Sequence, residues 1–230
     1  SLSPAEFTAV FRDEIGLIDN PNDSYIRLLY PNGDVAQHPH GGDQTITQSE
    51  DEYTISFTLD GELHTNGEDD GVYSVLIRAA NSISAFDTTL TMIYDTVIPF
   101  VTSVSVVGQT ETEYSVEDNS EVNDGITSVK AIVEDYTAGI YNIAHLSQIT
   151  LANADGATLE GVLTATVIDP NEKKVQLEWT LDTALLNDGT NDGKYFIKIE
   201  ASDKAGNGMI RSIPIYLFTP LAPQNFVWAV

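Results

Sequence analysis

The chain has 230 residues, of which 42% are hydrophobic and 20% are charged, so it carries enough apolar side chains for a core and is not a disordered polymer. Acidic side chains number 35 against 10 basic ones, which gives a net charge of -25. Such a surface repels phosphate backbones and anionic lipid surfaces, which argues against nucleic-acid partners. No stretch approaches the roughly 18 apolar residues of a membrane span, so insertion of this segment is not expected. The absence of cysteine excludes disulfides, thiolate nucleophiles and iron–sulfur clusters.

The predicted elements are short β-strands. Segments 7–11, 128–133 and 194–200 are rich in β-branched and aromatic residues, largely in alternation with polar ones. Nine of the 16 glycines follow Asn or Asp, a pairing typical of tight turns between strands. No segment shows a long helical period of apolar residues. About seven short strands per 100 residues predict an antiparallel β-sandwich.

The sequence also repeats itself at an offset of 122 or 123 residues. The segment 11–13 (Phe-Arg-Asp) corresponds to 133–135 (Val-Glu-Asp), and 70–73 (Asp-Gly-Val-Tyr) corresponds to 192–195 (Asp-Gly-Lys-Tyr). A register kept over so long a stretch indicates a duplication. We therefore predict two domains, 1–98 and 99–219, followed by a segment 220–230 that belongs to neither.

The run from Leu185 to Asn207 resembles the bacterial immunoglobulin-like (Ig-like) and fibronectin III-like repeats of large extracellular surface proteins. The segment Asp95–Pro99, leading into 101–106, resembles the joint between two such repeats. The resemblance implies an all-β fold of two Ig-like antiparallel β-sandwiches in tandem. It also implies a bacterial or archaeal protein, secreted or on the cell surface, in which this segment is non-catalytic and acts as a stalk, scaffold or adhesive. The first repeat departs from the pattern at 81–86, so we expect a different loop there.

Two tyrosines stand where such sandwiches carry a structural hydrogen bond. The pattern Asp-Gly-x-Tyr places Tyr73 and Tyr195 at the start of an alternating strand. We expect each hydroxyl to return to the preceding backbone and form a tyrosine corner. Phe57 and Trp179 occupy matching positions and are predicted to fill the two cores.

The repeat frame predicts that the first domain lacks its first strand. Residues 99–122 have no counterpart before the first repeat, whereas the C-terminal segment resembles 96–106. That segment ends in Phe226, Val227, Trp228, Ala229 and Val230. Two interpretations stay open. The chain is a slice of a longer array, or its last strand fills the missing position in another chain and builds a filament head to tail.

Oxygen-bearing side chains at alternate positions before glycine indicate possible calcium loops. The loop of the first repeat and the linker residue Asp95 are predicted to lie at the bottom of the first domain, and Asp135 and Asp203 in loops at the top of the second, so we expect these oxygens to converge at the joint; the second repeat has a matching loop. The candidate ligands are Asn66, Glu68, Asp69, Asp70, Asp95, Asp135, Asp188, Asp192 and Asp203. The alternative interpretation is that these residues only stabilise turns. Calcium is the sole cofactor that the sequence suggests.

No recognisable catalytic constellation occurs, so an enzyme is not expected. Besides the stalk and the filament, a third hypothesis is a carbohydrate-binding accessory module of a secreted enzyme. It requires a row of exposed aromatic side chains, to which Tyr25, Tyr30 and Tyr53 are the candidates. The predicted partners are accordingly other proteins, further copies of the chain, or carbohydrate.

Overall fold

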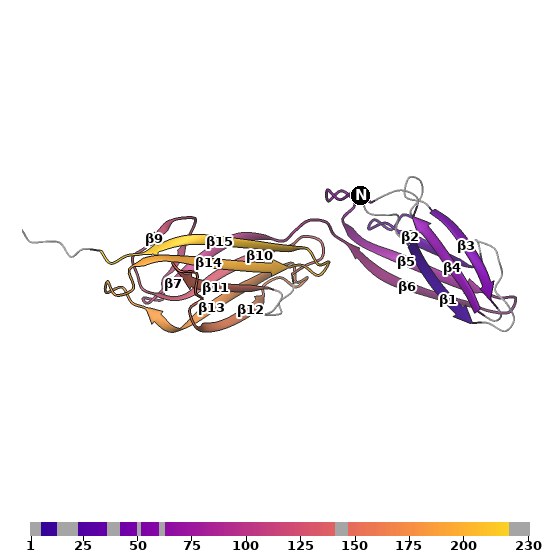
Figure 1. The fold of residues 1–230 in the computed structure, drawn as a ribbon. Helices are drawn as coiled ribbons and strands as arrows, with labels where there is room; N and C mark the ends of the chain where they lie inside the picture. Colours follow the sequence, from indigo (N-terminus) through magenta and orange to yellow (C-terminus); the bar gives the residue numbers. More distant parts are fainter. Residues whose placement is uncertain are drawn as a thin grey trace, which may run out of the picture. The chain divides into compact units, whose positions relative to one another are not determined.

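The computed structural model describes residues 6–12, 23–35, 42–49, 52–59, 63–140 and 147–220, and within them every regular element is a β-strand (Figure 1). The all-β fold class is therefore confirmed. The chain divides into two compact units, Ser1–Val97 and Ile98–Val230. None of the described residues forms a helix long and apolar enough to cross a bilayer. The predicted donor segment Phe226–Val230 lies outside the described residues.

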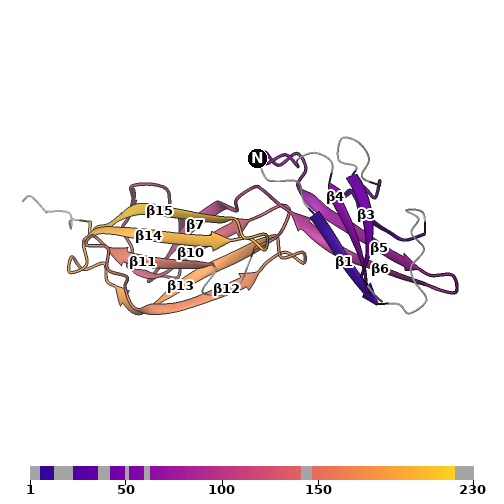
Figure 2. The same cartoon turned by 45° about the vertical axis from the view of Figure 1, so that its right-hand side comes forward.

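The second unit is a sandwich of two sheets, with strand orders β12-β13-β10-β7-β8 and β11-β14-β15-β9 (Figure 2). All neighbours pair antiparallel except β15 and β9, which pair in parallel. One apolar core joins side chains from both sheets, which is the Ig-like arrangement. The strands are β7 (Phe100–Gly108), β8 (Glu113–Ser115), β9 (Ser120–Val122), β10 (Ile126–Glu134), β11 (Gln148–Asn153), β12 (Gly161–Val167), β13 (Lys174–Leu185), β14 (Gly193–Ser202) and β15 (Gly208–Leu217).

The first unit has the same plan with fewer strands. Its sheets have the orders β1-β4-β3 and β2-β5-β6, and a smaller core joins them. Each strand matches one strand of the second unit, from β1 with β10 to β6 with β15. Within the described residues, nothing matches β7, β8 or β9. The strands are β1 (Glu6–Arg12), β2 (Tyr25–Leu29), β3 (Gly42–Ser49), β4 (Glu52–Leu59), β5 (Gly71–Ala80) and β6 (Ala85–Tyr94).

A buried serine repeats in the two units and shows that the duplication extends to single hydrogen bonds. The Ser24 hydroxyl accepts from the Ala80 backbone N–H at 3.0 Å and donates to the Ala80 carbonyl at 3.3 Å. The Ser147 hydroxyl makes the same pair of bonds with Ser202, at 3.2 and 3.5 Å. Both side chains are fully buried, so each satisfies backbone groups that water does not reach.

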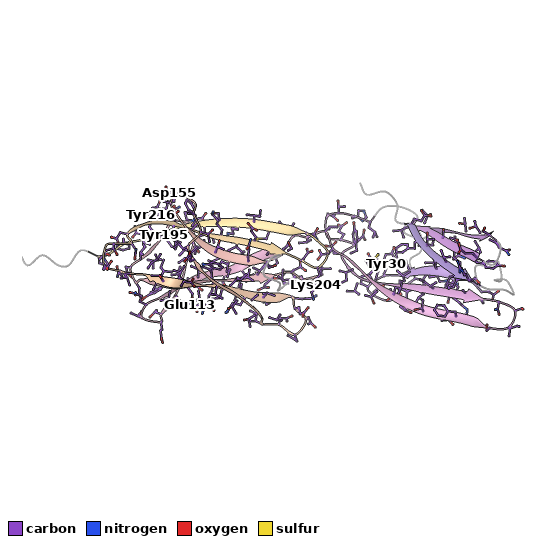
Figure 3. All side chains as sticks on the ribbon, turned by 60° about the horizontal axis from the view of Figure 1, so that its bottom comes forward. Tyr30, Glu113, Asp155, Tyr195, Lys204 and Tyr216 are labelled. Atoms are coloured by element: carbon purple, nitrogen blue, oxygen red, sulfur yellow. The ribbon has the colours of Figure 1, made fainter. Side chains whose placement is uncertain are left out.

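The tyrosine corners are confirmed in both units. The Tyr73 hydroxyl donates to the Asp69 carbonyl at 2.6 Å, and the Tyr195 hydroxyl donates to the Asn191 carbonyl at 2.8 Å (Tyr195 is labelled in Figure 3). Each bond ties the loop before a central strand to the body of its sandwich. The predicted core role of the matching aromatics is also confirmed, because Phe57 is buried and Trp179 packs against the core of its unit.

The loop between the last two strands differs between the repeats, as predicted. In the first unit the Asn81 side chain accepts from the backbone N–H groups of Ile83 and Ser84. In the second unit Asp203 accepts from those of Ala205 and Asn207, so its turn is one residue longer. This extra residue explains why the repeat offset changes from 122 to 123 at this point of the chain.

Candidate functional site

The end of each repeat is fastened to its own sandwich by an aspartate and a threonine, a pair that we call the clasp. Asp70 accepts from the Thr96 backbone N–H at 3.0 Å and from the Thr96 hydroxyl at 2.9 Å. The Thr96 hydroxyl oxygen in turn accepts from the Gly67 N–H at 3.1 Å. These bonds join the segment that follows β6 to the loop that precedes β5, so the chain leaves the first unit from a fixed point.

The second unit contains the same clasp. Asp192 accepts from the Thr219 backbone N–H at 3.0 Å and from the Thr219 hydroxyl at 2.9 Å. Because one device ends both repeats, it belongs to the repeat itself and not to the sequence that follows it.

The tyrosine corner lies beside the clasp, and both burial and nearby carboxylates raise the pKa of its hydroxyl. Burial, followed by the nearby Asp69 carboxylate, raises the pKa of Tyr73 to about 12. Burial and Asp192 raise the pKa of Tyr195 in the same way. Both hydroxyls therefore stay protonated at neutral pH and remain hydrogen-bond donors to the loop carbonyls.

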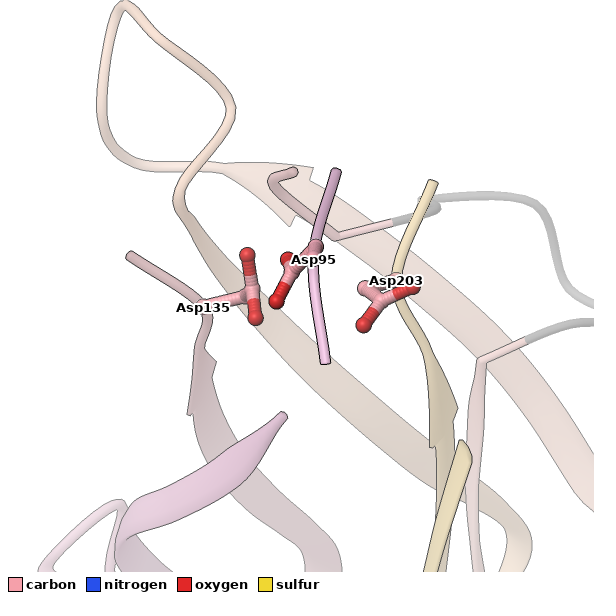
Figure 4. A group of neighbouring side chains, drawn as sticks. All are labelled: Asp95, Asp135 and Asp203. Carbon is pink, nitrogen blue, oxygen red and sulfur yellow. The ribbon is translucent and has the colours of Figure 1, made fainter. Parts of the chain in front are cut away.

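Two of the predicted metal ligands, Asp135 and Asp203, lie close together at one end of the second unit. Ligand oxygens of these two residues lie within 4.8 Å of one another, and Figure 4 shows both side chains. Asp95 belongs to the segment directly before the linker proline, Asp135 follows β10 and Asp203 follows β14. Their exposed fractions are 8%, 1% and 0%.

Each of these carboxylates also holds its own turn. Asp135 accepts from the backbone N–H groups of Thr137 and Gly139, at 3.0 and 2.8 Å. Asp203 accepts from two backbone N–H groups and from the Asn207 side-chain amide at 2.8 Å. Asp95 accepts from the Val97 N–H at 3.0 Å. These bonds offset part of the cost of burying the charges.

The cluster nevertheless concentrates negative charge out of water. Among the described residues, no ion pair involves Asp135 or Asp203. Carboxylates held this close repel one another strongly at low dielectric, and a divalent cation is the usual compensation. Oxygen ligands of this kind suit calcium.

The other six predicted ligands have different partners. Asn66 and Asp188 cap their own turns by accepting from the backbone N–H two residues on, at 3.2 and 2.9 Å. Asp69 accepts from the His64 backbone N–H at 2.6 Å, and Glu68 is exposed. Asp70 and Asp192 belong to the clasps. Asn66 and Asp188 thus have the turn-stabilising role that the sequence left open as the alternative.

Sequence reasoning identified the aspartates of the clasps but not their threonine partners. The available signal was that Thr96 and Thr219 recur at the repeat offset, each just after the last strand. A threonine that recurs after the last strand of each repeat, together with a recurring Asp-Gly-x-Tyr, predicts a hydrogen bond from the threonine hydroxyl to that aspartate.

The three tyrosines considered for carbohydrate binding do not form an exposed row. Tyr53 is buried in the core side of β4, and the Tyr30 ring packs against the Tyr73 ring with centroids 6.0 Å apart. The Tyr25 ring is covered by the guanidinium of Arg27, 3.9 Å from the ring centroid. None of the three offers a free ring face together with a neighbour.

No protein-family model matches the sequence, and no curated protein sequence matches it. The solved structures to which the chain is similar include the following three. Rst D1-D2 is 13% identical over 94% of this chain and 92% of that one, with a TM-score of 0.38. Dpr2 Ig1-Ig2, solved in complex with DIP-Theta Ig1-Ig3, is 16% identical over 94% of this chain and 54% of that one, with a TM-score of 0.32. CopC from Methylosinus trichosporium OB3b is 12% identical over 52% of this chain and 93% of that one, with a TM-score of 0.34.

At these TM-scores the likenesses add nothing to the fold assignment, which rests on the strand orders and the shared core of each sandwich. The resemblance to bacterial surface repeats stays a prediction from the sequence.

Proposed function

We propose that the chain is a non-catalytic structural segment of a secreted or cell-surface protein, whose tandem Ig-like domains act as a stiff stalk or scaffold. The observation that carries this proposal is the clasp found at the end of both repeats. The clasp fixes the point at which the chain leaves each sandwich. In a row of domains, a fixed exit point limits how far one domain can turn relative to the next. We take the presence of the clasp in both repeats as support for this role in orienting the chain.

The linker after the first clasp is short. Only residues 97–99 separate Thr96 from the start of β7, and the last of them is proline, which restricts its own φ and the residue before it. Few free backbone torsions therefore remain between the clasp and the next sandwich. A short linker with few free torsions behaves as a semi-rigid spacer, in contrast to a flexible Gly/Ser chain.

The test is a distance distribution between the two units. The absence of cysteine allows spin labels at Thr89→Cys and Val162→Cys, which are exposed positions in different units. Pulsed electron–electron resonance on this pair is expected to give a narrow distribution that broadens on adding Thr96→Ala. The matched control is Thr102→Ala, an exposed threonine of β7 outside the clasp. A parent distribution as broad as that of the Thr96 variant would refute the stiff-stalk proposal.

We also propose that calcium binds the buried carboxylates Asp135 and Asp203 at one end of the second unit. Free calcium at 100 times its Kd stabilises the folded state by about 2.7 kcal/mol. The melting temperature of the chain is expected to rise with calcium over chelator, and Asp203→Asn should abolish the rise. The control Asp118→Asn removes an equal charge from an exposed loop and should leave the rise intact. An equal melting temperature in calcium and chelator would contradict the calcium site and would leave the clasp argument standing.

A filament subunit is the second candidate function, and it rests on the resemblance of the C-terminal segment to residues 96–106 in the sequence. Carbohydrate binding has no such support, because Tyr25, Tyr30 and Tyr53 form no exposed row. A glycan array with the parent chain remains its direct test.

A further inference from the structure

A hollow of about 440 Å³ lies at the end of the second unit where β13 stops and β14 begins. One side of it comes from Leu159 and Glu160, just before β12, and the other side comes from the end of β13 and the loop that follows it. This is the end opposite to Asp203, since β14 begins here and runs toward that residue. The volume lies in the range of cavities that hold ligands.

Leucine side chains supply the apolar lining of the hollow. Leu159 packs against the core of the second unit, and Leu185 is 8% exposed. Leu186 lines the same hollow and is 44% exposed. An exposed leucine beside buried ones leaves apolar surface that the aliphatic part of a partner can cover.

Two carboxylates line the same hollow. The Asp182 backbone N–H donates to the Glu160 carbonyl at 3.1 Å, which keeps the two acidic residues beside each other. In the part of the chain that the structure describes, neither carboxylate takes part in an ion pair or a side-chain hydrogen bond. Both are therefore available to a cation from another molecule.

Hydrogen bonds hold both walls of the hollow in place. The Trp179 indole N–H donates to the Leu159 carbonyl at 3.2 Å. On the other wall the Leu186 N–H donates to the Asn191 side chain at 2.7 Å, and the Asn191 carbonyl accepts from the Tyr195 hydroxyl of the tyrosine corner. Because both walls are tied to the sandwich, little ordering entropy is lost when a ligand binds.

The first repeat contains the same loop without the leucine. His64 stands at the position of Leu186, at the repeat offset of 122 residues, and its backbone N–H donates to the Asp69 side chain at 2.6 Å. The Leu186 N–H makes the matching bond to Asn191. The turn thus forms with either residue, so turn formation does not account for an exposed leucine in the second repeat.

We propose that this hollow binds the side chain of an arginine that projects from a basic segment of a partner protein. An arginine side chain is an apolar stem that ends in a cation. The stem lies on Leu159 and Leu186, and the guanidinium reaches the carboxylates of Glu160 and Asp182. A guanidinium offers five donors in a planar fork and can serve two carboxylates at once, whereas a lysine ammonium is a single point charge.

The charge of the chain favours the same kind of partner. A net charge of -25 attracts basic molecules at long range, speeds their association and repels acidic ones. The hollow then selects among basic molecules by its apolar lining. The proposal adds a recognition site to the stalk function and does not depend on it, because the hollow lies within one unit and linker stiffness is measured separately.

The experiment is an NMR titration of the full chain, isotope-labelled in its leucine methyl groups, with the peptide acetyl-Gly-Arg-Gly-amide. The methyl signals of Leu159 and Leu186 are expected to shift in a saturable manner, and the shifts should weaken as salt is raised. The control peptide carries citrulline in place of arginine, which keeps the shape and removes the charge. It should bind about fivefold more weakly.

Two matched pairs of variants locate the binding, with the Leu159 methyl signals as the readout. Asp182→Asn should weaken binding about fivefold, whereas Asp155→Asn, which removes an equal charge from an exposed turn outside the hollow, should not. Leu186→Ala should also weaken binding, whereas Ile168→Ala, at a position that is 47% exposed elsewhere in the unit, should not. All of these side chains are exposed, so the variants are expected to fold, which the spectra themselves check.

Three results would overturn the proposal. The first is a set of methyl signals that do not move with the arginine peptide at millimolar concentration, or that move equally with the citrulline peptide. The second is binding that persists unchanged in Asp182→Asn, because the cation would then be meeting the acidic surface in general. The third is tighter binding of putrescine than of the peptide, which would make the occupant a free amine and not a protein side chain.

Discussion

Replacing the same inner position in the two repeats, Leu90 of β6 and Ile213 of β15, gives the sharpest check on how differently the two sandwiches bury it. Ile213→Ala removes a side chain that is 0% exposed and leaves a cavity in the core of the second unit. Such truncations cost about 2–5 kcal/mol. Leu90→Ala acts at a position that is 55% exposed, so less than half of the burial energy of a leucine is at stake. Since full burial contributes about 1.5–3 kcal/mol, its cost should be about 1 kcal/mol or less.

The assay is hydrogen exchange followed by mass spectrometry at dilute concentration. Peptides from β5 report the first unit and peptides from β14 report the second, so the two free energies of unfolding are read separately in one sample. Ile210→Ala is the control for the second unit, because Ile210 lies on the same strand as Ile213 and is 81% exposed. Its effect should lie within about 0.5 kcal/mol of zero.

An equal cost for Leu90→Ala and Ile213→Ala would refute the reasoning, because it would mean that the inner face of β6 is already covered in the monomer. A large loss in Ile210→Ala would show that the assay responds to strand propensity and not to burial.

The remaining predictions concern pH and the clasps. The raised pKa of Tyr73, about 12, means that its contribution to stability is present below pH 10 and is lost as pH rises through 12, so Tyr73→Phe should remove this alkaline decline from urea titrations of the first unit. The hydrogen bond from Lys174 lowers the pKa of Glu134, so its contribution is present above about pH 4.5 and is lost in acid. Lys174→Met should therefore destabilise the second unit at pH 7, and the free energy of unfolding of the variant should fall less than that of the parent as the pH is lowered below about 4.5. Thr219→Val deletes one hydrogen bond to Asp192 and should cost the second unit about 0.5–1.5 kcal/mol in thermal melts.

Much of the fold could be predicted because its signals are local. Alternation sets which side of a strand is apolar, and Asn-Gly and Asp-Gly pairs set where the chain turns. The tyrosine corner could be predicted as well, because its hydroxyl reaches a carbonyl only four residues earlier. Self-similarity at a constant offset then extended each local inference from one repeat to the other.

The site was predicted less completely because its members meet only after folding. The sequence offered nine acidic or amide residues as calcium ligands, some by their spacing before glycine and others by their place at the joint, and in the described part of the second unit Asp135 and Asp203 lie together. The same residue types also stabilise turns. Asn66 and Asp188 do so here, because each accepts a hydrogen bond from a nearby backbone N–H group. Spacing along the chain does not distinguish a calcium ligand from a turn-stabilising residue, because both roles place a side-chain oxygen about two residues before a bend.

By itself the sequence determined the all-β class, the duplication and the tyrosine corners. Each of these depends on the order of residues along one strand or on comparison between repeats. Only the tertiary structure decided that Leu90 is exposed where Ile213 is buried, that Asp70 holds Thr96, and that Asp135 lies close to Asp203. Burial and side-chain partnership depend on what other strands place nearby, and that is a property of packing in three dimensions.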